Sequence, residues 1–443
     1  MTMTMLQCRF DQVSRCVRQP LMFAVAALAA GAGQADDWPQ WRGLNRDGIS
    51  KETGWLTTWP AGGPKRLWQA EVGTGYGTVS VSKGRLYVLG NTDNTDTVYC
   101  LDANTGASVW KHSYPCEAKD VRAGYHGPRM TPTVDGDRVY TLSRHGHLFC
   151  LDAASGSVKW SKNLVSDLGG NEPVDGDDKG WGYACSPLVE GAWLIVEPGG
   201  KGTSAPEPAS PAPGPSVMAL EKQTGKVVWK AGNDRAAYSS PVAFDLKGQR
   251  CLAVFTAGGP VLRLVKDGSE LWRFDWKTAY EVNAATPIVS EDKLFISSGY
   301  NRGCALFDLN ATPPAPVWQS KAMRNHCNSC VLWQGHVYGF DESQLKCLEW
   351  ATGQMKWAEG KYRKGSVMVA DGKLILYSED GKLGIAEATP AGYKELAFTQ
   401  AIKVRPEYPG KAERTTWAVP VLANGRIYCR SQDDLVCLDV RGK

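Results

Sequence analysis

Short hydrophobic runs that alternate with polar residues dominate the chain after its first 35 residues. Residues 101–110 and 131–140 show the pattern well: β-branched and aromatic residues alternate with polar ones around Thr-Gly and Asp-Gly turns. A period of two, interrupted by turns in which Gly supplies a positive φ, predicts β-strands joined in hairpins. No segment after residue 35 has a long 3.6-residue apolar period. The pattern therefore predicts an all-β protein.

This pattern repeats along the chain. A unit that ends in an aromatic residue recurs, mostly at intervals of 39 to 50 residues, the length of a four-stranded propeller blade. Its last residues are Trp110, Trp160, Trp229, Trp272, Trp318, Trp357 and Phe398. The longer interval between Trp160 and Trp229 contains a Pro-rich stretch, residues 202–215, which we predict to be a flexible insert because it cannot pair as a strand.

A second feature counts the blades independently. An apolar triplet, opened by Ser or Thr in all cases but one, recurs eight times, and we interpret it as the inner strand of a blade. The triplets are residues 78–80, 131–133, 186–188, 240–242, 286–288, 329–331, 366–368 and 419–421. The eighth unit stops at Lys443 without an outer strand, whereas residues 66–69 have the outer-strand pattern without a blade. We therefore predict a single domain, residues 36–443, that forms an eight-bladed β-propeller with four-stranded blades, closed by an N-terminal strand that completes the last blade.

The first 35 residues have the pattern of a signal peptide. Arg9, Arg15 and Arg18 precede an apolar run at residues 21–32, and small residues stand before Asp36. This pattern predicts a cleaved signal peptide, residues 1–35, and a periplasmic or secreted protein without a membrane span in the mature chain. An uncleaved N-terminal anchor is the alternative interpretation.

Charge and cysteine positions indicate what the chain is not expected to bind and whether its thiols are paired. The chain has 50 basic and 46 acidic residues and no basic tract, so it is not expected to bind nucleic acid. Eleven cysteines follow the signal peptide, and Cys100, Cys150, Cys347 and Cys437 occupy the same position of the repeat. A residue that recurs at one strand position is most simply a small buried hydrophobe, so we expect mostly unpaired thiols.

The unit at residues 101–110, Leu-Asp-Ala-x-Thr-Gly-x-x-x-Trp, resembles the PQQ-type repeat of quinoprotein dehydrogenases and of BamB, the propeller of the outer-membrane barrel-assembly machinery. The opening residues 37–49, and residues 283–288 and 296–304, are similar to those of exported PQQ-like propellers of planctomycete-type bacteria. The resemblance covers residues 37–443 and implies the fold, whereas function depends on sites that differ among such proteins.

Residues just before the inner strands of a propeller converge on one mouth of its central channel. In this chain the candidate binding residues at these positions are Tyr76, Arg129, Tyr183, Tyr238, Asn283, His326, Lys364 and Trp417, with Arg363 beside Lys364. Aromatic faces and cationic donors together suit a planar ligand that is anionic or carries carbonyl groups. The alternative is that these residues are polar because water fills the channel.

Two functions remain open from the sequence. The first is a binding or scaffolding module that presents its loop face to protein, peptide or glycan, as a monomer, with no catalytic residue and no metal ligand assigned. The second is a PQQ-dependent oxidoreductase, for which the resemblance implies PQQ with calcium, held by residues such as Glu281 and Asn283, with Arg129 at the quinone carbonyls and Trp417 stacked on the ring. Two features of such dehydrogenases are missing, which argues against this second function. The chain has no adjacent Cys-Cys pair, and no Asp stands at the mouth positions.

Three weaker motifs are interpreted as structural. Cys327 and Cys330 have CxxC spacing after His326, but no second ligand pair accompanies them, so packing is favoured over zinc. Residues 175–180 begin like a calcium loop, but Lys179 stands at a ligand position. His145 and His147 flank a turn and are expected to be exposed.

Overall fold

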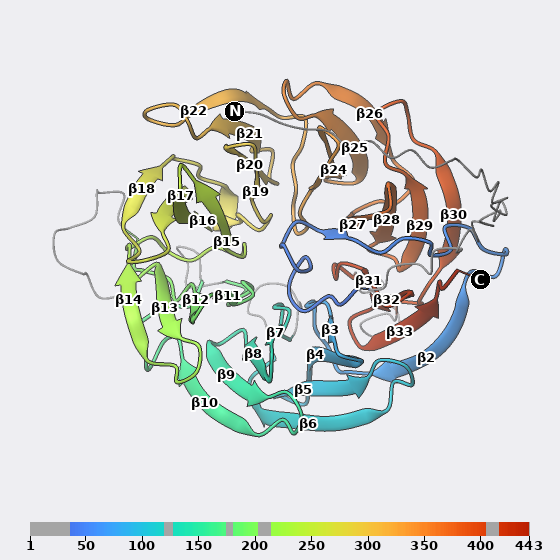
Figure 1. Cartoon of the computed structure of the whole chain (residues 1–443), viewed down its shortest axis with the longest axis horizontal. Coiled ribbons are helices and arrows are strands. Elements are labelled where there is room, and N and C mark those ends of the chain that lie inside the picture. The colour runs from blue at the N-terminus through green and yellow to red at the C-terminus, as the bar shows by residue number, and fades with distance from the viewer. Residues whose placement is uncertain (1–35, 119–126, 174–179, 203–213, 405–415, 443) are drawn as a thin grey trace, which may run out of the picture. The chain divides into compact units, whose positions relative to one another are not determined.

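The computed structural model describes residues 36–118, 127–173, 180–202, 214–404 and 416–442. The predicted signal peptide, the motif at residues 175–180 save Gly180, and most of the Pro-rich insert lie outside the described residues. The described part is all-β, with one short 3-10 helix, Ala279–Glu281. Its strands form eight sheets arranged as the blades of a ring (Figure 1), which confirms the predicted eight-bladed β-propeller.

Each blade is an antiparallel meander that runs from an inner to an outer strand. The first four blades are β3 (Ser80–Ser82), β4 (Arg85–Thr92), β5 (Thr95–Asp102), β6 (Ser108–Pro115); β7 (Thr133–Asp135), β8 (Arg138–Leu142), β9 (His147–Asp152), β10 (Val158–Asn163); β11 (Leu188–Glu190), β12 (Trp193–Val196), β13 (Val217–Glu221), β14 (Val227–Ala231); and β15 (Val242–Leu246), β16 (Gln249–Thr256), β17 (Gly259–Leu264), β18 (Glu270–Arg273). The next three are β19 (Ile288–Ser290), β20 (Lys293–Ser298), β21 (Gly303–Asp308), β22 (Ala315–Ser320); β23 (Val331–Trp333), β24 (His336–Asp341), β25 (Gln344–Glu349), β26 (Met355–Glu359); and β27 (Gly365–Ala370), β28 (Lys373–Ser378), β29 (Lys382–Glu387), β30 (Glu395–Gln400). The last blade contains β31 (Val421–Ala423), β32 (Arg426–Arg430) and β33 (Asp434–Asp439).

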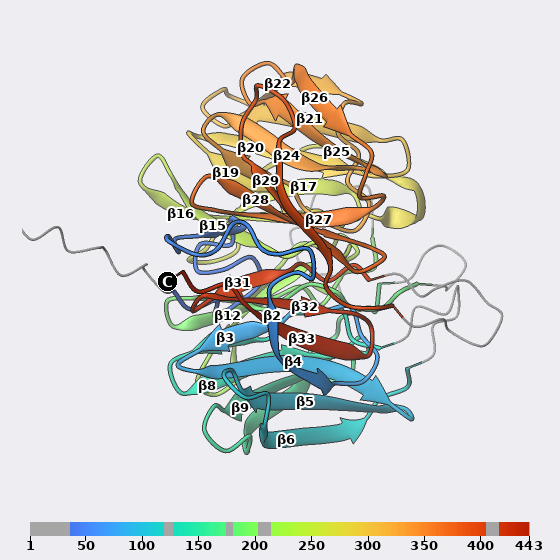
Figure 2. The same cartoon turned by 90° about the vertical axis from the view of Figure 1, so that its right-hand side faces the viewer.

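The outer strand of the last blade comes from the other end of the chain. Strand β2 (Lys65–Glu71) pairs antiparallel with β33, with Trp68 opposite Cys437. Both views show β2, in blue, alongside β33, in red (Figures 1 and 2). The predicted closure by an N-terminal strand is therefore confirmed, and the last blade has no open outer position.

The repeated Trp and Gly residues join each blade to the next. The indole of Trp110 donates a hydrogen bond to the carbonyl of Ala153 in the following blade, at 3.0 Å. The turn of that blade places Gly156 against the same indole, where a Cβ would lie 2.5 Å from the ring. Trp68, Trp160, Trp229, Trp318 and Trp357 donate in the same way to Ala103, Lys222, Val265, Trp350 and Thr389. The Trp of the repeat thus makes a blade-to-blade contact at six of the eight junctions.

Hydrogen bonds also join the inner strands at all eight junctions between blades. Besides the closing junction, six junctions have a Ser or Thr hydroxyl as donor or acceptor, such as Ser240 Oγ, which accepts from the Ser186 amide at 2.8 Å. The others in this group are Ser80 to Pro132, Thr131 to Ser186, Ser239 to Ala285, Thr286 to Ser329, and Ser366 to Ala418. Thr78 donates to Val419 across the closing junction, and the Asn328 amide donates to Gly365. The Ser and Thr residues that open the inner triplets therefore stabilise the ring at its axis.

One blade has a fifth strand, which the sequence pattern did not predict. Strand β1 (Ile49–Ser50) pairs in parallel with β27 on the inner side of its blade. It ends a stretch of chain, residues 37–50, that lies at the centre of the ring in Figure 1 and is called the axial segment below. Arg42 donates to the Cys330 carbonyl, and Arg46 donates to the carbonyls of Ser186, Pro187 and Pro241. The axial segment thus binds inner strands from several blades at once.

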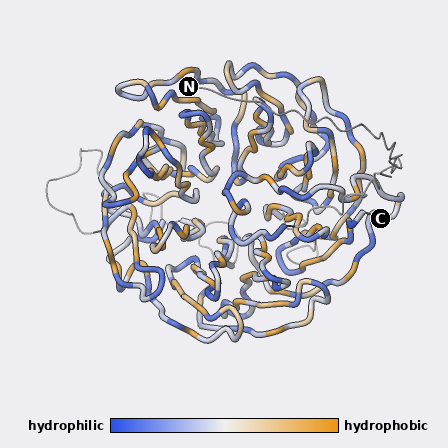
Figure 3. Tube along the Cα trace, viewed as in Figure 1, coloured by the Kyte–Doolittle hydropathy of each residue, from blue (hydrophilic) through white to orange (hydrophobic). Residues whose placement is uncertain are grey.

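The hydrophobic residues are packed within and between the blades, and hydrophilic and hydrophobic stretches alternate around the ring (Figure 3). Cys100, Cys150, Cys347 and Cys437 are fully buried, and the eleven cysteines of the described part form no disulfide. The recurrent cysteine is therefore a core residue, opposite a strand neighbour of its own blade such as Trp110 for Cys100 and Tyr140 for Cys150.

Candidate functional site: a pocket at the channel mouth

One mouth of the central channel contains a cavity of about 300 Å³, called the mouth pocket below. Its described lining residues are Trp41, Tyr76, Arg129, Trp181, Ala184, Ser186, Tyr238, Ser240, Val282, Ala284, Tyr300, His326, Cys327, Asn328, Lys364 and Trp417. Each of the eight blades contributes a residue that lies just before its inner strand, and Trp41 comes from the axial segment. Trp41 is held by a hydrogen bond from its indole to Thr286, at 2.8 Å.

Six of the eight residues predicted from repeat register line this pocket. They are Tyr76, Arg129, Tyr238, His326, Lys364 and Trp417. Their common position in the repeat brings them together although they are distant in sequence, because every blade enters its inner strand from the same side of the ring. Whether the six bind a ligand stays a prediction.

Tyr183 and Asn283 do not line the pocket, which corrects their predicted position. Tyr183 is 1% exposed and packs in the core, where its hydroxyl donates to the Pro198 carbonyl at 2.7 Å. Asn283 is fully buried: its amide donates to the Thr256 carbonyl, and its side-chain oxygen accepts from the Ser298 hydroxyl at 2.7 Å. Both side chains satisfy buried polar groups between strands instead of facing the channel.

Three aromatic residues of the pocket were missed by the sequence reasoning. Trp181 stands two residues before Tyr183, and it faces the pocket while Tyr183 faces the core. Tyr300 lies in the turn between β20 and β21, which reaches the same mouth. Trp41 belongs to the axial segment. The Trp-Gly-Tyr sequence at 181–183 was a usable signal, whereas nothing in the repeat pattern indicated Trp41 or Tyr300.

Aromatic rings form a continuous arc around the mouth. Neighbouring ring centroids lie 5.7 Å apart for Tyr238 and Trp181, 6.4 Å for Trp181 and Tyr280, 5.3 Å for Tyr280 and Tyr300, 4.8 Å for Tyr300 and His326, 6.5 Å for His326 and Trp417, and 5.4 Å for Trp417 and Tyr76. The Arg129 guanidinium lies over the Tyr76 ring, 5.8 Å from its centroid. Such an arc offers flat apolar surfaces together with a cation at one end.

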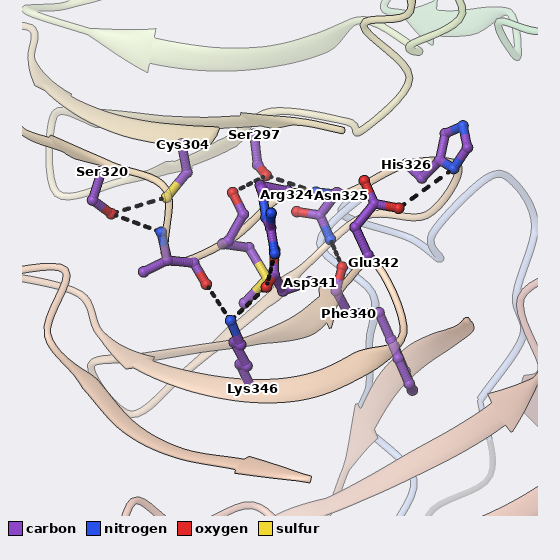
Figure 4. Close-up of polar contacts among 12 residues, drawn as sticks. Ser297, Cys304, Ser320, Arg324, Asn325, His326, Phe340, Asp341, Glu342 and Lys346 are labelled. Atoms are coloured by element: carbon purple, nitrogen blue, oxygen red, sulfur yellow. Dashed lines mark hydrogen bonds and ion pairs between the residues drawn. The ribbon is translucent and has the colours of Figure 1, made fainter. Parts of the chain in front are cut away.

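A second cation, Lys364, is held beside His326 and Glu342. The Lys364 ammonium lies 2.6 Å from His326 Nδ1 and 3.6 Å from the Glu342 carboxylate. Burial lowers the pKa of His326, and the Lys364 charge lowers it further, so the imidazole is neutral at pH 7 and accepts from the ammonium. Figure 4 shows His326 facing Glu342, while Arg324 and Lys346 converge on the neighbouring Asp341, with the Arg324–Asp341 contact at 2.7 Å. This ion-pair network fixes the loop that carries His326.

Cys327 and Cys330 differ in position. Cys327 lines the pocket, and burial raises the pKa of its thiol to about 12, so it carries no thiolate at neutral pH. Cys330 is buried in the core beside Ile288 and Phe295, and its thiol lies 3.0 Å from the Asn325 side-chain oxygen. In the part of the chain that the structure describes, no group of three His, Cys, Asp or Glu residues is placed to hold a metal ion.

The residues proposed for a calcium-bound quinone do not fit that group. Glu281 pairs with Arg235 at 3.2 Å and is not part of the mouth pocket, and the Asn283 side chain is fully engaged in buried hydrogen bonds. Among the described residues that line the main cavity there is no Asp or Glu, and Glu342, in the recess beside it, pairs with Lys364. Calcium needs several oxygen ligands, commonly carboxylates, and this set does not provide them.

His145 is not an isolated turn residue. Its Nδ1 lies 3.0 Å from the Glu172 carboxylate, and His147 Nδ1 lies 2.9 Å from the Ser143 hydroxyl. Both imidazoles are partly buried, so the expectation that they are exposed was wrong. His145 connects the turn between β8 and β9 to Glu172, and His147 bonds within that turn.

The eight closed blades, joined by the repeated Trp and Gly contact, define a PQQ-like repeat β-propeller with a pocket at its channel mouth. The family described as outer membrane protein assembly factor BamB matches residues 52–124 and 96–359, which is more than half of the chain. The chain belongs to this family. A relative named outer membrane protein assembly factor BamB, from Burkholderia pseudomallei (strain K96243), is 23% identical over 267 residues, which cover 54% of this chain and 68% of the relative.

Two solved structures share the fold. BamB from Moraxella catarrhalis superposes with a TM-score of 0.58 and 15% identity, covering 86% of this chain and 98% of that chain. A quinohemoprotein alcohol dehydrogenase from Pseudomonas putida HK5 superposes with a TM-score of 0.65 and 13% identity, covering 92% of this chain and 80% of that chain. At these identities the likeness concerns the fold, and it does not distinguish a protein-interaction propeller from a dehydrogenase.

Proposed function

We propose that this chain is an exported protein-binding module of the BamB kind, which engages a partner protein at the channel mouth. The mouth pocket carries this proposal, because all eight blades and the axial segment contribute side chains to it. Aromatic and Arg residues are the types that contribute most of the binding energy in protein interfaces. Membership of a family described as an outer membrane protein assembly factor supports a protein as the partner.

The ring is suited to this role because its binding residues are fixed by packing before a partner arrives. His326 and Lys364 are held by Glu342, and Trp41 is held by Thr286. Side chains that are already ordered lose little conformational entropy when a partner binds, so more of the interaction energy appears as affinity.

Export is the second part of the proposal. It is supported by the relationship to outer membrane assembly factors and by the basic and apolar pattern of residues 1–35, which lie outside the described residues. Among the described residues, no helix is both long and apolar enough to cross a bilayer. Expression of the full chain with a C-terminal tag, followed by N-terminal sequencing of the exported fraction, should give Asp36 as the first residue.

Site-specific photo-crosslinking tests the binding face. A benzoylphenylalanine at Tyr280, which is 48% exposed and adjoins Trp181 and Tyr300, should give a discrete adduct in the cells that produce the protein. Gln223 is the matched control, because it is exposed in the turn between β13 and β14 on the opposite face of the ring. The adduct is identified by mass spectrometry, and the purified partner is then titrated against the wild-type protein and Trp417→Ala.

Two results together would support the proposal. An adduct forms at Tyr280, and the partner identified in it binds the purified wild-type protein at least tenfold more tightly than it binds the Trp417→Ala variant. Equal adducts from Tyr280 and Gln223, or a partner that binds both proteins equally, would contradict a function at the mouth.

A cofactor-capture experiment tests the dehydrogenase function directly. Purified protein incubated with PQQ and Ca²⁺ should not reduce an artificial dye with alcohols or sugars, because the described lining supplies no carboxylate for calcium. Substrate-dependent dye reduction would overturn the binding-module function.

A further inference from the structure

Asn328 lines the mouth pocket and carries a side-chain oxygen without a hydrogen-bond partner among the described residues. The residue is 7% exposed and lines the pocket, and its amide nitrogen donates to the Gly365 carbonyl at 3.0 Å. That bond fixes the amide plane, because the nitrogen must face Gly365 and the oxygen must face away from it. The oxygen is buried and has no hydrogen-bond partner among the described residues. A buried acceptor without a partner is costly, and a donor from a bound molecule would remove this cost.

A cation lies next to this acceptor. Lys364 and Asn328 line the same recess beside the pocket, together with His326, Glu342 and Trp417. The ammonium of Lys364 has three N–H donors, and two are directed at His326 and Glu342, so a third can donate to a further anionic partner. A molecule that satisfies both residues therefore carries a carboxylate and an N–H donor on neighbouring atoms.

The rest of the pocket is suited to an aromatic ring. Trp417 and Tyr76 form one wall, with centroids 5.4 Å apart, and Arg129 lies over Tyr76. The axial segment closes the base with Trp41. A cavity of about 300 Å³ is at the small end of the range for ligand pockets, so it admits one residue rather than a long peptide.

We propose that the mouth pocket binds the C-terminal aromatic residue of a partner protein. Its carboxylate is bound by Lys364 with Arg129, its backbone N–H donates to the Asn328 side-chain oxygen, and its ring packs on Trp417 and Tyr76. Charged hydrogen bonds and ring stacking are complementary to the groups that line the pocket. This inference rests on the proposed function and names the part of the partner that is recognised.

The ligand side is tested by titration of the purified full chain with the peptide Ala-Ala-Ala-Ala-Trp. The free-carboxylate peptide should bind at least tenfold more tightly than its C-terminal amide and than the same peptide ending in Leu. N-Acetyltryptophan should bind at least tenfold more tightly than indole-3-propionate, which keeps the ring and the carboxylate but lacks the N–H. The pentapeptide should bind at least as tightly as N-acetyltryptophan, because the pocket takes only the terminal residue and both molecules carry its three groups. Binding of N-acetyltryptophan without binding of the pentapeptide would assign the site to a free acylated amino acid and overturn a protein terminus as the ligand.

The protein side uses a matched control at the same mouth. Lys364→Gln and Asn328→Leu should each weaken peptide binding at least tenfold. Arg363→Gln should change it less than twofold, because Arg363 is largely exposed, pairs with Glu379 and is not part of the lining. Thermal melting checks each variant. If Asn328→Leu does not fold, the peptide with an N-methylated terminal residue replaces it, and the same tenfold loss is expected.

Failure of this inference is distinct from failure of the proposed function. Equal affinity of the free-acid and amide peptides, or an equal loss in Lys364→Gln and Arg363→Gln, would overturn recognition of a C-terminus. The adduct at Tyr280 would in that case still report a protein partner at the mouth.

Discussion

The side chains that recur once per blade are those that join neighbouring blades. Trp110 is 9% exposed, and its indole both packs on Gly156 and donates to the Ala153 carbonyl. The indole hydrogen bond recurs at five other junctions, and at four of these a Gly also packs on the indole. A residue of this kind stabilises the molecule through two blades rather than one.

Removal of one such indole should therefore cost much more than removal of an indole at the mouth. We expect Trp110→Ala to lower the free energy of unfolding by about 3–5 kcal/mol, because it leaves a cavity and an unpaired carbonyl. Trp181→Ala, at the mouth pocket, is the control and should change the free energy of unfolding by less than about 1 kcal/mol. Urea denaturation of both variants measures the difference, and equal losses would contradict this role for Trp110.

Glu197 is a buried carboxyl beside the axial segment. It is 1% exposed, and burial raises its pKa to about 8, while Arg46 opposes this shift. The folded chain therefore keeps this proton up to about pH 8, whereas the unfolded chain loses it near the ordinary Glu pKa. Between these pH values the folded state binds more protons, so this residue lowers the stability as pH rises.

Glu197→Gln should remove this pH dependence. The stability of the wild-type protein relative to Glu197→Gln should fall between pH 5 and pH 8, by up to about 1.4 kcal/mol per pH unit. Urea denaturation of both proteins at pH 5, 6, 7 and 8 measures the slope. Parallel profiles for the two proteins would show that Glu197 is ionised in the folded state.

The candidate site was partly predictable at the scale of residues. Repeat register located Tyr76, Arg129 and Trp417, because position in a blade determines position at the mouth. Register does not determine the direction of a side chain, and Tyr183 and Asn283 face the core, where buried carbonyls and hydroxyls satisfy their polar atoms. The direction depends on neighbours from other blades, which the local sequence does not contain.

Among the elements, the axial segment was the least predictable. Residues 37–50 have no strand period, and Arg42 and Arg46 are fully buried only because carbonyls from distant inner strands converge on them. The inner strands themselves were predicted in number, but seven of the eight begin two residues later than expected. The first residues of the predicted triplets, such as Thr131, Ser186 and Thr286, donate a hydrogen bond to the adjacent blade instead of pairing with the second strand of their own blade.

Deletion of residues 36–50 should weaken the propeller without opening it. The deletion removes the buried hydrogen bonds of Arg42 and Arg46, each worth roughly 1.5–3 kcal/mol, but it keeps β2. We expect cooperative unfolding with a lower melting temperature. Leu44→Ser is the control within the same segment. Because Leu44 is 54% exposed, the melting temperature of this variant should match that of the wild type. A deletion protein that also melts like the wild type would show that the axial segment is dispensable.

For the whole molecule, the decisive contact is that between β2 and β33. Deletion of residues 36–71 removes the outer strand of the last blade and exposes β33 and its apolar neighbours. An open strand edge of this kind pairs with other chains. We expect aggregation or loss of a cooperative transition, measured by light scattering and calorimetry, in contrast to the shorter deletion. A monomeric protein with a sharp transition would contradict closure by β2.

The pairing of β2 with β33 also sets the order in which the molecule can be completed. Trp68 and Cys437 are 369 residues apart in the chain, so the ribosome produces them at widely separated times, and the two lie opposite each other in one sheet. Contacts between residues so distant in sequence give a high contact order, and their loop-closure entropy is paid before the contacts form. Strand β2 therefore has no partner strand until β33 has been synthesised. Until β33 is present, the chain exposes the unpaired edge of β2, which can pair with other chains.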